Sequence, residues 1–282
     1  MTALAACTRA ELLRLRRWPA LWAMAGTWLL LNITFVYVFP YLSYRNGGGF
    51  ANDGVAPRQL LAGVMPDHVP VAVVQGMPMF GGAILFALGA LAAGTGYGWG
   101  TWKAAFTQGP GRPAVLGGTL GGLAGIVIAL VITTFAVDTA IATTLAAAEG
   151  HGIAWPAAGD LARAFGGGVL ILSLWATAGL AVGTLTRNPA LAVALGLVWT
   201  LAVENLLRAT SSLLDWLRAV TDVLPGTAAG STAAALGAVP VSEGGAPGVA
   251  DNLGGGSAAA LTVAYLIAFV IITGMLIRRD VT

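Results

Sequence analysis

Charged residues, cysteine and histidine are scarce in this sequence of 282 residues. Asp, Glu, Lys and Arg together make up 9% of the chain, against about 25% in an average soluble protein. The single cysteine, Cys7, excludes an internal disulfide and a thiolate metal cluster, and the two histidines lack the spacing of a metal site. No Gly-Lys pair occurs, which excludes a phosphate-binding loop of the Walker type. We therefore expect no catalytic residues, no metal and no cofactor on this chain.

Apolar residues dominate the composition of this sequence. They form 57% of the sequence, with a mean hydropathy of +0.82. A helix needs roughly 20 apolar residues to cross a bilayer, and six continuous runs approach or exceed that length. Continuous runs favour helices over barrel strands, in which apolar and polar residues alternate. The sequence predicts an all-α, polytopic membrane protein forming one transmembrane domain over 1–282, with spans at 20–42, 69–93, 114–137, 168–186, 190–207 and 258–277.

The 14 basic residues are distributed unevenly between the two sides of these spans. With both termini cytoplasmic, nine of them lie inside and five outside, and the positive-inside rule favours this orientation. The predicted location is a bacterial plasma membrane, with the chain in contact with lipid. So few charges give no indication of a nucleic-acid partner.

Residues 1–17 have the pattern of an amphipathic interfacial helix. Leu4, Thr8, Leu12 and Leu15 form one stripe, and basic residues lie beside it. The third span opens with "GGTLGGLAG", whose glycines recur four residues apart. Such spacing predicts close helix packing, either inside the bundle or between two copies of the chain. The glycines concerned are Gly117, Gly121 and Gly125.

Residues 211–256 form a long outer segment. Within it "LLDWLRAVTDVLPG" predicts a short amphipathic helix that Pro225 ends, and a mobile loop rich in Gly, Ala, Ser and Pro is expected after it. Two carboxylates, Asp138 and Glu204, lie near the outer ends of predicted spans. Each is a candidate for a substrate pathway or outer gate, although a simple hydrogen bond at a helix end, or for Glu204 a pair with Arg208, would also explain it.

The stretch "GWGTWKAAFTQGPGR" separates the second and third predicted spans. As a helix over 97–111, it places Trp99, Trp102 and Phe106 on one stripe and Lys103 beside them, before Gly109-Pro110-Gly111 ends the helix. A plain connection needs only a few residues. A structured connection of this length indicates docking to another protein in the cytoplasm.

The arrangement resembles the permease subunits of type 2 ATP-binding cassette (ABC-2) exporters. The resemblance includes the basic N-terminal "ELLRLRRWPALW", six spans, the passage "GTGYGWGTWKAAFTQGPGRPAVLGGTL" and an outer segment ending "LPG". Either Gly94-Thr95 or Gly100-Thr101 matches the Gly-Thr of the family, and Arg112 its turn arginine. The acidic residue usual in the family is absent, and glycine stands where a lysine is often found.

The resemblance implies a coupling helix at 97–111 and a mechanism driven by a partner. Two nucleotide-binding ATPase subunits would bind ATP and Mg²⁺ beneath two permease protomers, paired as a homodimer or a heterodimer. The ATPase would contact Trp99, Trp102, Lys103, Phe106, Arg112, Arg16 and Arg17. The cargo would be a hydrophobic or amphipathic molecule such as a drug, a natural product, a peptide or a lipid. Two alternatives are an ion-coupled secondary transporter that uses Asp138 or Glu204, and a membrane scaffold that transports nothing.

Overall fold

The computed structural model describes residues 2–47, 56–102, 104, 109–210 and 215–279, which form helices and connections without a strand. Six helical segments are long and apolar enough to cross a membrane, and each contains one of the predicted spans. The prediction of an all-α protein with six candidate membrane-spanning helices is therefore confirmed. Spans one to six are Pro19–Asn46, Pro66–Gly98, Arg112–Ala148, Ala158–Thr186, Pro189–Thr210 and Gly255–Arg279.

Spans one, two and five are interrupted by wider turns of π-helix. Span one consists of α2 (Pro19–Asn32), η1 (Ile33–Val38) and α3 (Phe39–Asn46). Span two consists of the 3₁₀ turn η2 (Pro66–His68), α5 (Val69–Gln75), the π-helical η3 (Met77–Gly81) and α6 (Gly82–Gly98). Span five consists of α10 (Pro189–Leu197), η4 (Val198–Val203) and α11 (Glu204–Thr210). Because proline removes a backbone donor inside a helix, Pro40 and Pro78 explain the local change of hydrogen bonding in the first two cases. Spans three, four and six are the continuous helices α8 (Arg112–Ala148), α9 (Ala158–Thr186) and α14 (Gly255–Arg279).

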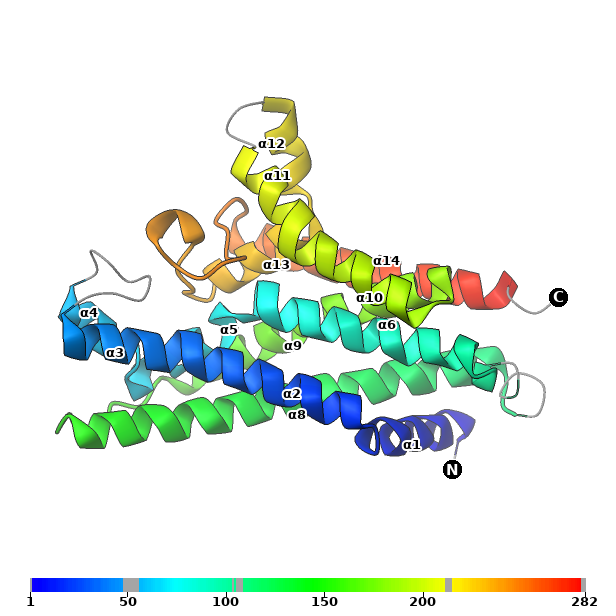
Figure 1. Cartoon of the computed structure of the whole chain (residues 1–282), viewed down its shortest axis with the longest axis horizontal. Coiled ribbons are helices and arrows are strands. Elements are labelled where there is room, and N and C mark those ends of the chain that lie inside the picture. The colour runs from blue at the N-terminus through cyan, green and yellow to red at the C-terminus, as the bar shows by residue number, and fades with distance from the viewer. Residues whose placement is uncertain (1, 48–55, 103, 105–108, 211–214, 280–282) are drawn as a thin grey trace.

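The spans run roughly along one common axis except for α11, the last part of span five, and both termini lie at the same end of the bundle (Figure 1). This end, called the termini end below, also carries the connections from α6 to α8 and from α9 to α10. The opposite end, called the far end, carries the short helix α4 (Pro57–Ala62) and residues 149–157.

Spans two and four form the centre of the bundle, because α6 and α9 approach each other through glycine. A Cβ atom at Gly89 would lie 2.0 Å from the carbonyl oxygen of Ala176, and one at Gly179 would lie 1.9 Å from that of Phe86. Such contacts leave no room for a side chain, so the two backbones touch directly. Leu172 and Trp175 of α9 are almost fully buried beside this contact.

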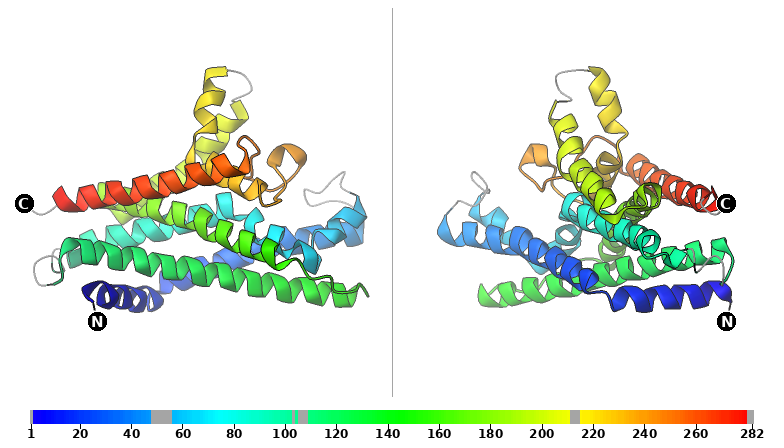
Figure 2. Two further views of the ribbon diagram at one scale, coloured as in Figure 1. Left: turned by 180° about the vertical axis from the view of Figure 1, so that it is seen from behind. Right: turned by 45° about the vertical axis from the view of Figure 1, so that its right-hand side comes forward.

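The N-terminal helix α1 (Ala3–Arg16) packs lengthwise on the start of α8, and the two helices run in the same direction (Figures 1 and 2). The predicted stripe meets the glycines of α8: a Cβ at Gly117 would lie 2.6 Å from Leu4, one at Gly121 2.8 Å from Thr8, and one at Gly125 3.0 Å from Leu12. The glycine spacing therefore packs two helices of the same chain. The stripe predicted for residues 1–17 lies against α8.

The outer segment contains more structure than the sequence predicted. Helices α11 and α12 (Asp215–Asp222) project sideways from the bundle (Figures 1 and 2). Pro225 begins a further helix, α13 (Pro225–Ala234), because proline fits the first turn of a helix, where its missing donor is not needed. Residues 226–233 are all buried, and Thr232 Oγ1 lies 3.2 Å from Thr262 Oγ1 of α14. The expectation of a mobile loop directly after Pro225 is therefore wrong.

Candidate functional site

The connection that leaves span two folds back onto the last turns of α6. The indole nitrogen of Trp102 donates a hydrogen bond to the carbonyl oxygen of Ala93 at 3.0 Å, and the hydroxyl of Thr101 donates to that of Gly96 at 3.1 Å. Gly96 leaves room for the indole, since a Cβ there would lie 2.1 Å from the ring nitrogen. Tyr97 covers the ring, with centroids 5.9 Å apart. The start of the connection is thus fixed to α6.

This geometry corrects the prediction that Trp102 is an exposed docking residue. Its side chain is 7% exposed, because the indole fills the space above Gly96 and satisfies its N–H inside the chain. Trp99 is 72% exposed and is the exposed aromatic side chain among the described residues of the connection. Lys103 and Phe106, which were expected to lie beside it, fall outside the described residues.

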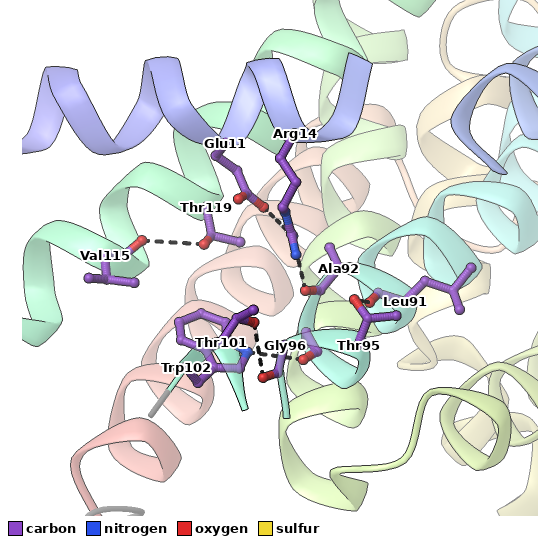
Figure 3. A network of polar contacts seen from close by, with 11 residues as sticks. Glu11, Arg14, Leu91, Ala92, Thr95, Gly96, Thr101, Trp102, Val115 and Thr119 are labelled. Atoms are coloured by element: carbon purple, nitrogen blue, oxygen red, sulfur yellow. Dashed lines mark hydrogen bonds and ion pairs between the residues drawn. The ribbon is translucent and has the colours of Figure 1, made fainter. Parts of the chain in front are cut away.

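One ion pair within α1 lies beside α6 and α8 (Figure 3). Arg14 Nη2 lies 2.5 Å from Glu11 Oε1 and donates a second hydrogen bond to the carbonyl oxygen of Ala92 at 3.2 Å. The stem of Glu11 rests on α8, where a Cβ at Gly122 would lie 2.7 Å from its Cγ. A cavity of about 130 Å³ lies between this pair, Trp102 and the start of α8. A polar contact therefore connects α1 to α6, and the stem of Glu11 packs the same part of α1 against α8.

The predicted basic contacts fall into two groups. Arg16 and Arg17 end α1 with exposed side chains. Arg112 instead begins α8 and donates to the carbonyl oxygen of Arg278 at 2.9 Å, so it connects α8 to the end of α14. The termini end therefore presents Arg16, Arg17 and Trp99 at its surface, while Arg14, Trp102 and Arg112 hold helices together.

Glu204 has a structural role in this chain. Its side chain is 1% exposed, and Oε1 accepts a hydrogen bond from the backbone N–H of Thr227 at 3.0 Å. A Cβ at Gly226 would lie 2.5 Å from Oε2, so the carboxylate sits directly on the first turn of α13. Arg208 follows one turn later on α11 and donates to the carbonyl oxygen of Gly248 at 3.4 Å. Of the three expectations for Glu204, a hydrogen bond at a helix end describes its geometry.

Asp138 belongs to α8, where its side chain faces span one and is fully buried. Asn32 donates to its Oδ1 from the amide nitrogen at 2.7 Å. Three buried oxygens of this cluster have no hydrogen-bond partner among the described residues: Asp138 Oδ2, Asn32 Oδ1 and the Tyr37 hydroxyl. Asp138 and Glu204 have separate partners on separate helices, so the structure does not bring the two candidate carboxylates together.

Sequence reasoning missed the partners of Asp138. Asn32 also lines a cavity of about 140 Å³, and Trp28 beside it donates to the hydroxyl of Thr134 at 2.9 Å. The available signal was an asparagine inside an otherwise apolar run, which a membrane span rarely carries without a partner. Its spacing from Trp28, one helical turn, matches that between Thr134 and Asp138 on the opposite helix.

A second polar cluster joins span one to the end of α8 at the far end. Glu149 accepts hydrogen bonds from the hydroxyls of Tyr41 at 2.7 Å and Tyr44 at 3.3 Å, and it pairs with Arg45 at 3.3 Å. The hydrogen bond from Tyr41 is the main reason why the pKa of this carboxyl lies below its usual value. Span one is thus bonded to α8 along much of its length.

No family model matches the chain, and no curated protein resembles it significantly. Its function is therefore argued from its residues and their geometry. Among the described residues, no three His, Cys, Asp or Glu side chains are close enough together to hold a metal ion. At the termini end, hydrogen bonds connect α1 and the start of the connection to α6, beside a surface formed by Trp99, Arg16 and Arg17.

Proposed function

We propose that this protein is the permease subunit of an ABC-2 exporter in a bacterial plasma membrane. In this proposal both termini are cytoplasmic, and two permease protomers pair above two copies of a separate ATPase. The ATPase binds ATP and Mg²⁺, and the permease moves a hydrophobic or amphipathic molecule out of the cell. The chain supplies the pathway and a lever, because it carries no phosphate-binding loop.

One observation carries the proposal: the connection between spans two and three is attached to the bundle on its inner side and presents Trp99 on its outer side. Trp102 fixes the connection to α6, Arg14 bonds α1 to α6, and α1 packs on the glycines of α8. A force applied at Trp99 would therefore reach three helices together. Rigid-body transmission of this kind suits a subunit that must respond to the closure of an ATPase.

The exposed residues around Trp99 suit a protein partner. Aromatic and arginine side chains are enriched at interface hot spots, and Arg16 and Arg17 lie at the same end of the bundle. Truncating a buried interface tryptophan costs about 2 kcal/mol or more, which is roughly 30-fold in affinity. Trp99 therefore replaces Trp102 as the residue that we expect to enter a groove of the ATPase.

The experiment compares Trp99→Ala with Trp155→Ala in cells that also produce the proposed ATPase partner. Trp155 is a matched control, since it is 65% exposed and lies at the far end. We expect Trp99→Ala to insert normally, to retain roughly one thirtieth of the affinity for the ATPase in a titrated pull-down, and to lose ATP-driven transport. Equal recovery of the ATPase with both variants would contradict the proposed docking surface.

Asp138 supports a second candidate, ion-coupled transport. A carboxylate buried in a membrane span with an unpartnered oxygen is a common feature of proton and cation pathways. Transport in energised vesicles without ATP separates the two mechanisms. Uptake that follows an imposed proton or sodium gradient and needs no ATPase would favour this second function over the first.

A further inference from the structure

A cavity of about 140 Å³ lies between span one, span two and the loop at 244–247. Its volume is close to that of an engineered protein cavity of about 150 Å³ that binds benzene. No Asp, Glu, Lys or Arg side chain lines it, and its polar lining side chains are Asn32 and Gln75. The space therefore suits one compact group, such as a small ring or the head of a longer molecule.

Aromatic rings form much of the wall. Phe35 of η1 packs edge-on against Phe39 at 5.2 Å and stacks on Phe80 of η3 at 5.6 Å between centroids. Trp28 closes another side, and the absence of a side chain at Gly76 leaves space next to its ring. The two π-helical segments thus contribute rings from neighbouring spans. Several aromatic faces around a small space are the arrangement that binds alkylammonium groups in proteins.

The carboxyl group of Asp138 lies behind this wall, next to the lining residue Asn32. Asp138 is fully buried, and its hydrogen bond comes from the neutral amide of Asn32, which itself lines the cavity. No basic side chain among the described residues pairs with Asp138. The Asn32 oxygen and the second Asp138 oxygen are both buried without a hydrogen-bond partner. A carboxylate in such surroundings favours a nearby cation and opposes an anion.

We infer that this cavity binds the cationic head of an amphiphile, a quaternary or alkylated ammonium group whose apolar tail lies outside it. The rings of Phe35, Phe39 and Phe80 surround the methyl groups, and Asp138 supplies the countercharge from behind Asn32. A neutral molecule of the same shape gains the apolar contacts but leaves the carboxylate uncompensated. That the bound molecule is the cargo rests on the proposed function. The binding itself does not.

The test uses the purified full-length protein without an ATPase. Phenyltrimethylammonium cannot lose its charge by deprotonation, and tert-butylbenzene is its neutral isostere. Binding of both radiolabelled probes is measured by equilibrium dialysis against protein-free micelles. We expect Asp138→Asn, which retains an oxygen that can accept from Asn32, to weaken the cation at least 10-fold and to change the neutral probe less than twofold. Asp160→Asn is the control, because Asp160 pairs with Arg163 at the surface of α9.

A second variant keeps the test informative if the Asp138→Asn protein does not fold. Phe39→Leu keeps an apolar side chain at the cavity, and we expect it to weaken the cation at least fivefold. Absence of cation binding to the wild type at millimolar concentration would overturn the inference, as would equal cation binding by the wild type and a folded Asp138→Asn protein. Because no ATPase is present, failure to find an ATPase partner would leave the dialysis result intact and would remove only its interpretation as cargo.

Discussion

Glu204→Gln tests whether a single carboxylate holds α13 in place. The helix is almost entirely buried, yet its sequence, "PGTAAGSTAA", contains no large apolar side chain. Glu204 lies on its first turn, where the backbone N–H groups of Gly226 and Thr227 interact with the carboxylate. Glutamine has nearly the same shape but carries no charge. It also places an amide donor where one oxygen now faces backbone donors.

The expected cost follows from these contacts. Removing an N-cap acceptor costs about 0.5–2 kcal/mol, and a partly buried charge at a helix N-terminus contributes up to about 2 kcal/mol. Glutamine keeps one acceptor and loses the charge, so we expect a loss of about 2 kcal/mol. This corresponds to a roughly 30-fold increase in the population of chains in which α13 has opened.

The assay measures that population through a buried cysteine. Ser231 lies in α13 and is fully buried, and serine and cysteine differ little in size. With Cys7→Ser as background, the cysteine of Ser231→Cys reacts with N-ethylmaleimide only when the helix opens. We expect Glu204→Gln to raise the labelling rate roughly 30-fold, in line with the energy above.

The control is Glu243→Gln, which removes an exposed carboxylate from the short helix η6 (Val241–Glu243). That change should alter the labelling rate less than twofold. If Glu204→Gln labels as slowly as this control, the carboxylate does not hold α13, and the structural role assigned to Glu204 is wrong.

Two further predictions concern the contacts of α8. Gly118→Val should displace α1, because a Cβ there would lie 2.5 Å from Cys7. We expect maleimide labelling of Cys7 to become at least 10-fold faster in this variant. Gly159→Val is the control, because Gly159 lies in open space, and it should not change the labelling rate. Glu149→Gln should lower the melting temperature at pH 7. Since the pKa of Glu149 is lowered in the folded state, its stabilisation is present above the unfolded value near 4.5 and is lost as pH falls further. The difference in melting temperature should therefore shrink below pH 4, and a constant difference would contradict the assigned hydrogen bonds.

The spans and the apolar stripe of α1 could be predicted because both follow from local pattern. Continuous apolar runs have the length of a bilayer, and Leu4, Thr8 and Leu12 recur at the helical period. What pattern alone does not contain is the partner of each face. The stripe of α1 suits lipid and a glycine-lined helix equally well, and the five close contacts with α8 become visible only in three dimensions.

The candidate site was harder to predict, because its residues act through contacts distant in sequence. Trp102 fits an exposed stripe on helical period alone, but the missing side chain at Gly96 gives its indole a place to fold inward. The sequence around Pro225 predicts a helix end, although proline is equally suited to a first turn. Glu204 becomes a cap only because α13 begins there. The sequence predicts Asp138 at the outer end of the third span, whereas α8 continues to Ala148, and the pairing of Asp138 with Asn32 joins residues 106 positions apart.

That separation has a consequence for biosynthesis. Trp28 and Asn32 each donate a hydrogen bond to a residue of α8 that lies 106 positions later in the chain. The polar partners of span one are therefore synthesised much later than span one itself. At about 5–20 residues per second, the ribosome needs roughly 5–20 s to add the intervening segment. During that interval an amide and an indole donor lie in the bilayer without their final acceptors. A chain that ends after span two would retain this exposed polar face permanently, which would make it a substrate for membrane quality control.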